Sequence, residues 1–175
     1  MSKNLKVVLL GYMTSGKSTI GKVLGEQLKI AFVDLDDKIA DAEGMPVSEI
    51  FSRKGELFFR KKETEILSRQ LDEESSFILS LGGGTPCYGK NLEIIHAKTE
   101  NTFYLKLNIS SLLERLTNEK SKRPLVANIA DDDLPEFIGK HLFERNQFYA
   151  SAKRIIECDG KSVQWIVDEI ANKLL

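Results

Sequence analysis

Short apolar runs alternate with longer stretches of helical spacing along this chain. In the last such stretch, residues 163–174, apolar side chains recur every three or four positions, as in an amphipathic helix. Strands that alternate with helices predict a parallel sheet joined by helical crossovers. The runs that we interpret as strands are residues 6–10, 30–33, 77–81, 102–107 and 154–157.

A glycine-rich segment follows the first predicted strand. Gly11-Tyr12-Met13-Thr14-Ser15-Gly16-Lys17-Ser18 matches the phosphate-binding pattern G-x-x-x-x-G-K-[ST], and residues 19–28 after it have helical spacing. Backbone N–H groups of such a loop point at phosphate oxygens. We expect Lys17 to neutralise the β- and γ-phosphates of a nucleotide and Ser18 to offer its hydroxyl to Mg²⁺. A glycine-rich turn that matches by chance is the alternative. The residues predicted to bind the nucleotide here are Thr14, Ser15, Gly16, Lys17, Ser18 and Thr19.

Two carboxylates, Asp34 and Asp36, follow the second predicted strand. Ligands of an open parallel sheet lie beyond the carboxyl ends of its strands, so we expect both acids near the phosphate loop. Side chains two apart in an extended segment point the same way, so both can face one pocket. One near Mg²⁺ and one near an acceptor hydroxyl would fit phosphoryl transfer. The alternative is a pair of helix-capping acids, a role that is open to Asp36.

Residues 34–71 form a long, charged, mostly helical insertion between the second and third strands. Within it, Arg60 and Glu63 are three apart, so they can pair on one helix face. A guanidinium held by such a neighbour is preorganised to bind a carboxylate through two hydrogen bonds. A surface ion pair is the alternative.

Three glycines, Gly82, Gly83 and Gly84, follow the third predicted strand. They allow a ligand to approach the backbone closely, and a flexible turn is the alternative. Phosphate-loop enzymes often place an acid for the metal at this point, where this chain has Leu81 and Gly82. Metal binding is therefore expected to fall to Ser18 and Asp34.

Residues 118–135 are polar and irregular, and they include Lys122-Arg123-Pro124-Leu125. An irregular stretch of this length inside a compact domain is usually functional or mobile. Phosphate transfer requires that water be excluded before the γ-phosphate is committed, so we expect a lid here. Arg123, closing from that lid, would stabilise charge on the transferring phosphoryl group. A solvated loop without a role is the alternative.

Composition limits the classes of function. The 175 residues suit a single domain, and 42% hydrophobic and 29% charged residues are ordinary for a soluble globular protein. A net charge of −1 gives no global field that favours nucleic acid or an anionic membrane, and no run approaches the length of a membrane span. The two cysteines, Cys87 and Cys158, match no metal or redox spacing and are predicted to be buried or idle thiols. We expect a cytoplasmic protein and, by default, a monomer.

Together these residues resemble the shikimate kinases, and the resemblance covers essentially the whole chain. Each motif is modest alone, but six in this order are highly specific. The resemblance implies a three-layer P-loop kinase fold, an α/β fold with a five-stranded parallel sheet flanked by helices, plus a lid. It also implies transfer of the γ-phosphate of ATP to the 3-hydroxyl of shikimate, in aromatic amino-acid biosynthesis. The six motifs are the phosphate loop, F-x-D-x-D, G-E-x-x-F-R-x-x-E, G-G-G, K-R-P-L and E-R-x-x-x-Y.

The resemblance also implies roles for single residues. Asp34 belongs with the Mg²⁺ site, and Asp36 meets the accepting hydroxyls as the candidate base. Arg60 and Arg145 bind the substrate carboxylate, and Arg123 is the lid arginine. The glycines from Gly82 to Gly84 pack against shikimate. Arg115 resembles the residue that stacks on adenine, with the loop 159–162 opposite.

Two other classes of protein fit part of this pattern. A related small-molecule kinase, acting on gluconate or a nucleoside monophosphate, shares the loop and lid but does not need two arginines directed at one carboxylate. A guanine-specific switch usually carries an N-K-x-D element, which this sequence lacks. A catalytically inactive regulator would be expected to have lost Lys17, Asp36 or Arg123, and all three are present.

Overall fold

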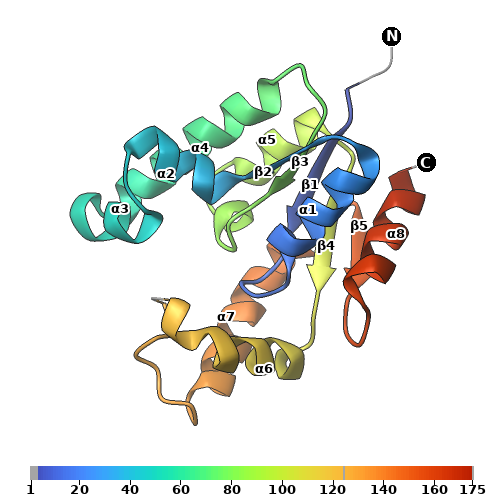
Figure 1. The fold of residues 1–175 in the computed structure, drawn as a ribbon. Helices are drawn as coiled ribbons and strands as arrows, with labels where there is room; N and C mark the ends of the chain where they lie inside the picture. Colours follow the sequence, from blue (N-terminus) through green and yellow to red (C-terminus); the bar gives the residue numbers. More distant parts are fainter. Residues whose placement is uncertain (1–3, 124, 175) are drawn as a thin grey trace.

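One parallel sheet forms the centre of the computed structural model, which describes residues 4–123 and 125–174 (Figure 1). Within these residues the sheet has five strands in the order β2-β3-β1-β4-β5. Every predicted strand is confirmed, and its ends shift by no more than one residue. The strands are β1 Lys6–Leu10, β2 Ala31–Asp34, β3 Phe77–Ser80, β4 Thr102–Lys106 and β5 Arg154–Glu157.

Helices cover both faces of the sheet, which gives three layers (Figure 1). The connection from β1 to β2 runs along the sheet in one direction, and the connections from β2 to β3, β4 and β5 run in the opposite direction. Because such crossovers are right-handed, the helix between β1 and β2 lies on one face of the sheet and the helices of the later connections lie on the other. On one face α1 (Lys17–Leu28) packs against α8 (Val163–Leu174). On the other face α4 (Glu56–Asp72) packs against α5 (Asn91–Lys98), and α7 (Leu134–Tyr149) contacts the short 3₁₀ helix η1 (Thr85–Cys87).

The central strand is β1, which pairs with β3 on one side and β4 on the other. Its residues Val7, Val8, Leu9 and Leu10 are all 0% exposed. Because helices cover both faces, side chains of either orientation are buried, and the strand appears in the sequence as an unbroken apolar run.

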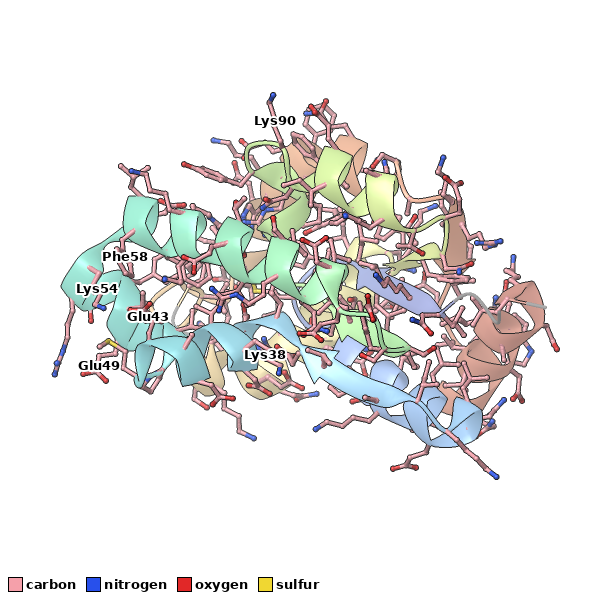
Figure 2. All side chains as sticks on the ribbon, turned by 90° about the horizontal axis from the view of Figure 1, so that it is seen from above. Lys38, Glu43, Glu49, Lys54, Phe58 and Lys90 are labelled. Atoms are coloured by element: carbon pink, nitrogen blue, oxygen red, sulfur yellow. The ribbon has the colours of Figure 1, made fainter. Side chains whose placement is uncertain are left out.

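The predicted helical insertion folds as three helices. These are α2 (Leu35–Glu43), α3 (Val47–Lys54) and α4, which pack on one another beyond the edge strand β2 (Figure 1). Lys54 connects them: its Nζ donates to Glu43 at 2.5 Å and lies 4.6 Å from the ring centroid of Phe58. Figure 2 shows these three side chains together at the end of the region. The insertion therefore forms one connected helical unit next to the cleft.

The predicted lid segment lies between α6 and α7. The helix α6 (Ile109–Glu119) is followed by a short 3₁₀ helix, η2 (Lys120–Lys122), and turns lie at residues 125–128 and 131–133 before α7. Pro124 of the K-R-P-L motif lies outside the described residues. Val126 is fully buried, and Lys120 pairs with Asp131 at 2.8 Å. Val126 and Leu134 thus anchor the segment to the core, while its movement as a lid stays a prediction.

The cysteines were predicted to be buried or idle thiols, and burial is confirmed for Cys158. Within the described residues both are free, Cys158 buried and Cys87 half-buried. None of the helices found in residues 4–123 and 125–174 combines the length and the apolar character needed to cross a bilayer.

Candidate active site

Two adjoining pockets lie at the carboxyl ends of β1, β2 and β3. The larger pocket has a volume of about 500 Å³ and the smaller pocket about 220 Å³. Every residue predicted for the site lines one or both of them. The two pockets are parts of one cleft, because they share five lining residues: Met13, Asp36, Gly82, Gly83 and Arg123.

The phosphate loop joins β1 to α1, as its sequence context predicted. Gly16 precedes the first residue of α1 with φ +94°, a conformation that glycine adopts without steric cost. Gly11 is required for space: a Cβ there would lie 2.9 Å from the carbonyl oxygen of Leu105. The loop thus wraps closely around the larger pocket.

Thr14 is an unusual residue within this loop. Its φ of +63° lies in the left-handed region, which β-branched residues rarely adopt. Its Oγ1 is buried, and the described part of the chain supplies no hydrogen-bond partner for it. Its carbonyl oxygen accepts a hydrogen bond of 3.0 Å from Arg115 Nη1. The loop therefore holds Thr14 in a conformation that costs free energy.

Lys17 lies against the inner side of the loop. Its Nζ donates to the carbonyl oxygens of Gly11 at 2.7 Å and Tyr12 at 2.9 Å. Burial lowers the pKa of Lys17 to about 8, against the opposing effect of Asp36. A phosphate in the larger pocket would supply the negative charge that favours the ammonium form.

Asp34 and Asp36 both line the larger pocket, as predicted, but the reason given from the sequence is wrong. Asp34 ends β2, whereas Asp36 belongs to the first turn of α2, so the two are not neighbours on one extended segment. Asp34 is also the capping acid: its side chain accepts from the backbone N–H of Asp36 at 3.0 Å and of Asp37 at 3.4 Å. The helix thus begins at the pocket, and its first turn carries Asp36 inward.

The electrostatics of Asp36 suit a proton acceptor. Burial, with the negative charges of Asp34 and Glu63, raises the pKa of Asp36 to about 6. A carboxylate with a pKa close to neutrality is still mostly ionised at pH 7, yet it accepts a proton more readily than an exposed one.

Ser18 and Asp34 form the pair expected at a magnesium site. Ser18 Oγ donates to Asp34 Oδ2 at 2.9 Å, at the exposed edge of the larger pocket. Mg²⁺ prefers oxygen ligands and usually takes only one or two from the protein, beside substrate phosphates and water. The residues present therefore fit the ion.

Two arginines from different helices meet at the smaller pocket. A Cβ on Gly84 would lie 2.5 Å from Nη2 of Arg60, on α4, and one on Gly83 would lie 3.2 Å from Nη1 of Arg145, on α7. None of Gly82, Gly83 and Gly84 has a positive φ. Space, rather than backbone conformation, therefore requires these glycines.

Arg60 is held by a buried acid, and the helix that carries Arg145 is joined to the loop of Gly82, Gly83 and Gly84. Arg60 Nη1 donates to Glu63 Oε1 at 2.8 Å, and the side chain of Glu63 is only 1% exposed, so the predicted pair is not a surface ion pair. The residue Tyr149 lies one turn after Arg145 on α7, and its hydroxyl donates to Gly83 O at 2.6 Å. The second contact joins α7 to the glycine loop (residues 82–84).

Arg115 and the loop before α8 border the same end of the larger pocket. Lys161 and Val163 line it from the loop side. Asp159 connects this loop to the start of α6 by accepting from the backbone N–H of Asn108 at 3.1 Å and from Ser111 Oγ at 2.7 Å. If Arg115 stacks on adenine, as predicted, the adenine must lie at this end of the larger pocket.

Sequence reasoning missed two contacts of the site. Tyr12 in the phosphate loop hydrogen-bonds through its hydroxyl to His141 Nδ1 on α7 at 2.9 Å, and Thr85 Oγ1 donates to Glu63 Oε2 at 2.7 Å. Both join residues that are far apart in the sequence, and no local pattern marks them.

Comparisons with known proteins agree on one family. The family model described as shikimate kinase matches residues 13–175. The shikimate kinase of Flavobacterium psychrophilum is 47% identical, over 94% of this chain and 96% of its own length. That of Flavobacterium johnsoniae is 41% identical, over 97% and 98%.

Solved structures give the same result. The crystal structure of shikimate kinase from Bacteroides thetaiotaomicron superposes with a TM-score of 0.87 at 32% identity, covering 97% of this chain and 96% of that one. The Acinetobacter baumannii shikimate kinase in complex with shikimate also gives a TM-score of 0.87, at 26% identity, covering 98% and 93%. A gluconokinase from Sinorhizobium meliloti, at 15% identity and a TM-score of 0.61, shares the fold alone.

Proposed function

This chain belongs to the shikimate kinase family, and we propose from that premise how its cleft divides the reaction. The enzyme transfers the γ-phosphate of ATP to the 3-hydroxyl of shikimate, giving shikimate 3-phosphate and ADP. In our proposal the larger pocket holds ATP and the smaller pocket holds shikimate. The observation that carries this division is that Asp36 and Arg123 line both pockets, at their junction.

The nucleotide half is built on the phosphate loop. Backbone N–H groups of residues 14–19 bind the phosphates, Lys17 neutralises their charge, and Arg115 packs against the adenine. Ser18 and Asp34 would hold Mg²⁺, which when bound neutralises charge on the β- and γ-phosphates. The hydrogen bond between these two side chains supports this assignment.

The acceptor half is built on the two arginines. Arg60 and Arg145 bind the carboxylate of shikimate, and the glycines from Gly82 to Gly84 pack against its ring. This leaves the opposite side of the ring, with the 3-hydroxyl, towards Asp36. The convergence of two guanidinium groups on adjacent glycines supports a carboxylate-bearing substrate.

Transfer takes place at the junction. The 3-oxygen of shikimate forms a bond to the γ-phosphorus as the bond from that phosphorus to the bridging oxygen of ADP breaks. Asp36 orients the hydroxyl and takes its proton, for which its raised pKa is suited. Arg123 neutralises charge on the phosphoryl group as it moves.

The proposal includes three further expectations. Residues 118–135 close over the cleft as a lid, which would exclude water from the γ-phosphate. The enzyme works as a monomer, and it is located in the cytoplasm. The small net charge of −1 favours binding of small molecules over binding of nucleic acid or a membrane surface.

The rate of ADP formation with different acceptors tests the function. We expect shikimate to support turnover, while gluconate and nucleoside monophosphates leave ADP formation at the rate seen without acceptor. Gluconate is the sharpest comparison because a gluconokinase shares the fold. Equal rates with gluconate and shikimate would overturn the proposal.

A further inference from the structure

A buried chain of hydrogen bonds lies behind Arg60. Glu63 uses its two carboxylate oxygens for different partners: Oε1 accepts from Arg60 Nη1 at 2.8 Å, and Oε2 accepts from Thr85 Oγ1 at 2.7 Å. Thr85 begins the 3₁₀ helix η1 (Thr85–Cys87), directly after the glycine loop. The guanidinium of α4 is thus connected to the loop that borders both pockets.

The chain continues into α5 and returns to α4. Asn91, the first residue of α5, donates through Nδ2 to the carbonyl oxygen of Thr85 at 2.9 Å. Its Oδ1 accepts from Thr64 Oγ1 at 2.8 Å. Thr85 and Asn91 are 0% exposed and Glu63 is 1% exposed, so water does not compete for the bonds from Thr85 to Glu63 and from Asn91 to Thr85.

The burial of Glu63 makes its second partner important. An ionised carboxylate that is withdrawn from water needs a donor on each oxygen, because an unsatisfied buried charge is costly. Without the hydroxyl of Thr85, Oε2 would lose its donor. Arg60 already donates to Oε1, and its guanidinium could then donate to both carboxylate oxygens through two parallel N–H groups.

Such a two-bond pair would change what Arg60 offers to the pocket. A guanidinium has five N–H groups in a fixed plane, so two bonds to Glu63 would also fix the direction of that plane. In the structure only Nη1 is hydrogen-bonded to Glu63, and Nη2 lies against Gly84 at the smaller pocket.

We propose that Thr85, supported by Asn91, is a positioning residue for the acceptor site. Its hydroxyl donates to Glu63 Oε2, so that Arg60 makes only one hydrogen bond to Glu63 and its guanidinium stays directed towards the substrate carboxylate. This inference rests on the proposed role of Arg60. Thr85 is also joined to the adjacent loop, because its backbone N–H donates to the carbonyl oxygen of Gly82 at 3.1 Å.

Thr85→Val tests the proposal, because valine has nearly the same shape without the hydroxyl. We expect the KM for shikimate to rise by about tenfold, the scale of one lost hydrogen bond to a charged group, and the KM for ATP to change by less than about twofold. Thr85→Ser keeps the hydroxyl and should restore the KM for shikimate. An unchanged KM for shikimate in folded Thr85→Val would overturn the proposal.

Thr102→Val is the matched control for a loss of stability alone. Thr102 is also 0% exposed, and its hydroxyl accepts a hydrogen bond of 2.9 Å from the backbone N–H of Lys153, at the amino end of β4. We expect Thr102→Val to lower the Tm without raising the KM for shikimate. If both valine variants raise it equally, the effect of Thr85 is general destabilisation and the proposal fails.

A double-mutant comparison separates this inference from the role of Arg60. If Thr85 acts through Arg60, adding Thr85→Val to Arg60→Lys should raise the KM for shikimate by less than about twofold more. A full, independent tenfold increase would contradict action through Arg60. If Arg60→Lys alone leaves shikimate binding unchanged, the proposed role of Arg60 fails. If Arg60→Lys weakens binding and Thr85→Val does not, only the inference on Thr85 fails.

Discussion

Single residues around the cleft are held in states that cost free energy. Lys17 is buried with its pKa lowered to about 8, Asp36 is half-buried near Asp34 and Glu63 with its pKa raised to about 6, and Thr14 has a φ of +63°. Perturbed ionisation and backbone strain concentrate at functional sites, where the surrounding structure holds them in place. Replacing such residues should therefore affect stability and activity in different directions.

Thr14→Gly is expected to stabilise the protein without ligands. It removes the strained backbone conformation and a buried hydroxyl for which residues 4–123 and 125–174 offer no partner. Relief of strain exceeds the entropic cost of glycine, so the free energy of unfolding should rise by about 1 kcal/mol in urea denaturation. Thr19→Gly, in the regular helix α1, is the control and should lower it. A less stable Thr14→Gly protein would contradict the strain argument.

Replacement of Asp36 separates two roles for its carboxylate. Removal of a general base typically costs about 10²–10⁴-fold in rate, and we expect Asp36→Asn to lose turnover within that range while shikimate affinity falls only modestly. An orienting role predicts a smaller loss for Asn than for Ala, because the amide keeps one acceptor, whereas a pure base predicts similar losses. Single-turnover rates of Asp36→Asn and Asp36→Ala distinguish the orienting role from the general-base role. A fully active Asp36→Asn enzyme would show that the carboxylate is structural.

Connections between elements determine how the two halves of the cleft are held together. The phosphate loop is joined to α7 by the hydrogen bond between Tyr12 and His141, one turn before Arg145. The predicted lid segment follows α6, where Arg123 Nη2 lies 3.1 Å from Glu119 Oε2 and Lys120 pairs with Asp131. The hydrogen bond between Tyr12 and His141 therefore links the phosphate loop, at the larger pocket, to the helix that carries Arg145 at the smaller pocket.

Acid should lower the stability of the fold through His141. Burial, followed by the positive charge of Arg145, lowers the pKa of His141 to about 4, below its ordinary value of 6.5. The unfolded chain therefore takes up a proton first as the pH falls, so lowering the pH from 7 to 5 favours unfolding. His141→Gln cannot titrate, and its free energy of unfolding should fall less over this range than that of the wild type. Equal losses in urea titrations at the two pH values would refute this prediction.

Arg123→Ala tests the lid assignment. If Arg123 acts on the transferring phosphoryl group, turnover should fall by roughly 10²-fold or more, and by more than either apparent affinity changes. Lys122→Ala is the neighbouring control: Lys122 lies in the same segment but lines neither pocket, so its replacement should leave turnover close to normal. Similar effects of the two substitutions in steady-state kinetics would count against a specific role for Arg123.

At the scale of the whole molecule, the sequence predicted the fold well because its signals are local. Both faces of β1 are covered, so residues 7–10 form an apolar run that identifies a strand without any tertiary information. The phosphate loop was equally clear, since its glycines fix a backbone shape. Asp36 was predicted in the correct pocket for the wrong reason, because β2 ends at Asp34 and the helix begins at once.

What the sequence could not predict depends on distant contacts. Tyr12 and His141, or Glu63 and Thr85, come together only through the order of the strands and the packing of helices on them. The order of the strands also determines which residues line the cleft. Because α4 and α7 lie on the same face of the sheet, Arg60 and Arg145 both reach the smaller pocket. The arrangement of the whole molecule thus places two cations at the smaller pocket and the phosphate loop at the larger pocket.

Titration calorimetry of Arg60→Lys and Arg145→Lys, with shikimate and with ATP as separate ligands, tests this division of the cleft most directly. Each substitution removes charge-assisted hydrogen bonds to the carboxylate, so shikimate binding should weaken by about 1–3 kcal/mol while ATP binding barely changes. Arg69→Lys, at an exposed ion pair on α4, is the control and should alter neither. Equal losses for ATP and shikimate, or unchanged shikimate binding in both variants, would contradict the assignment of the two arginines to the acceptor carboxylate.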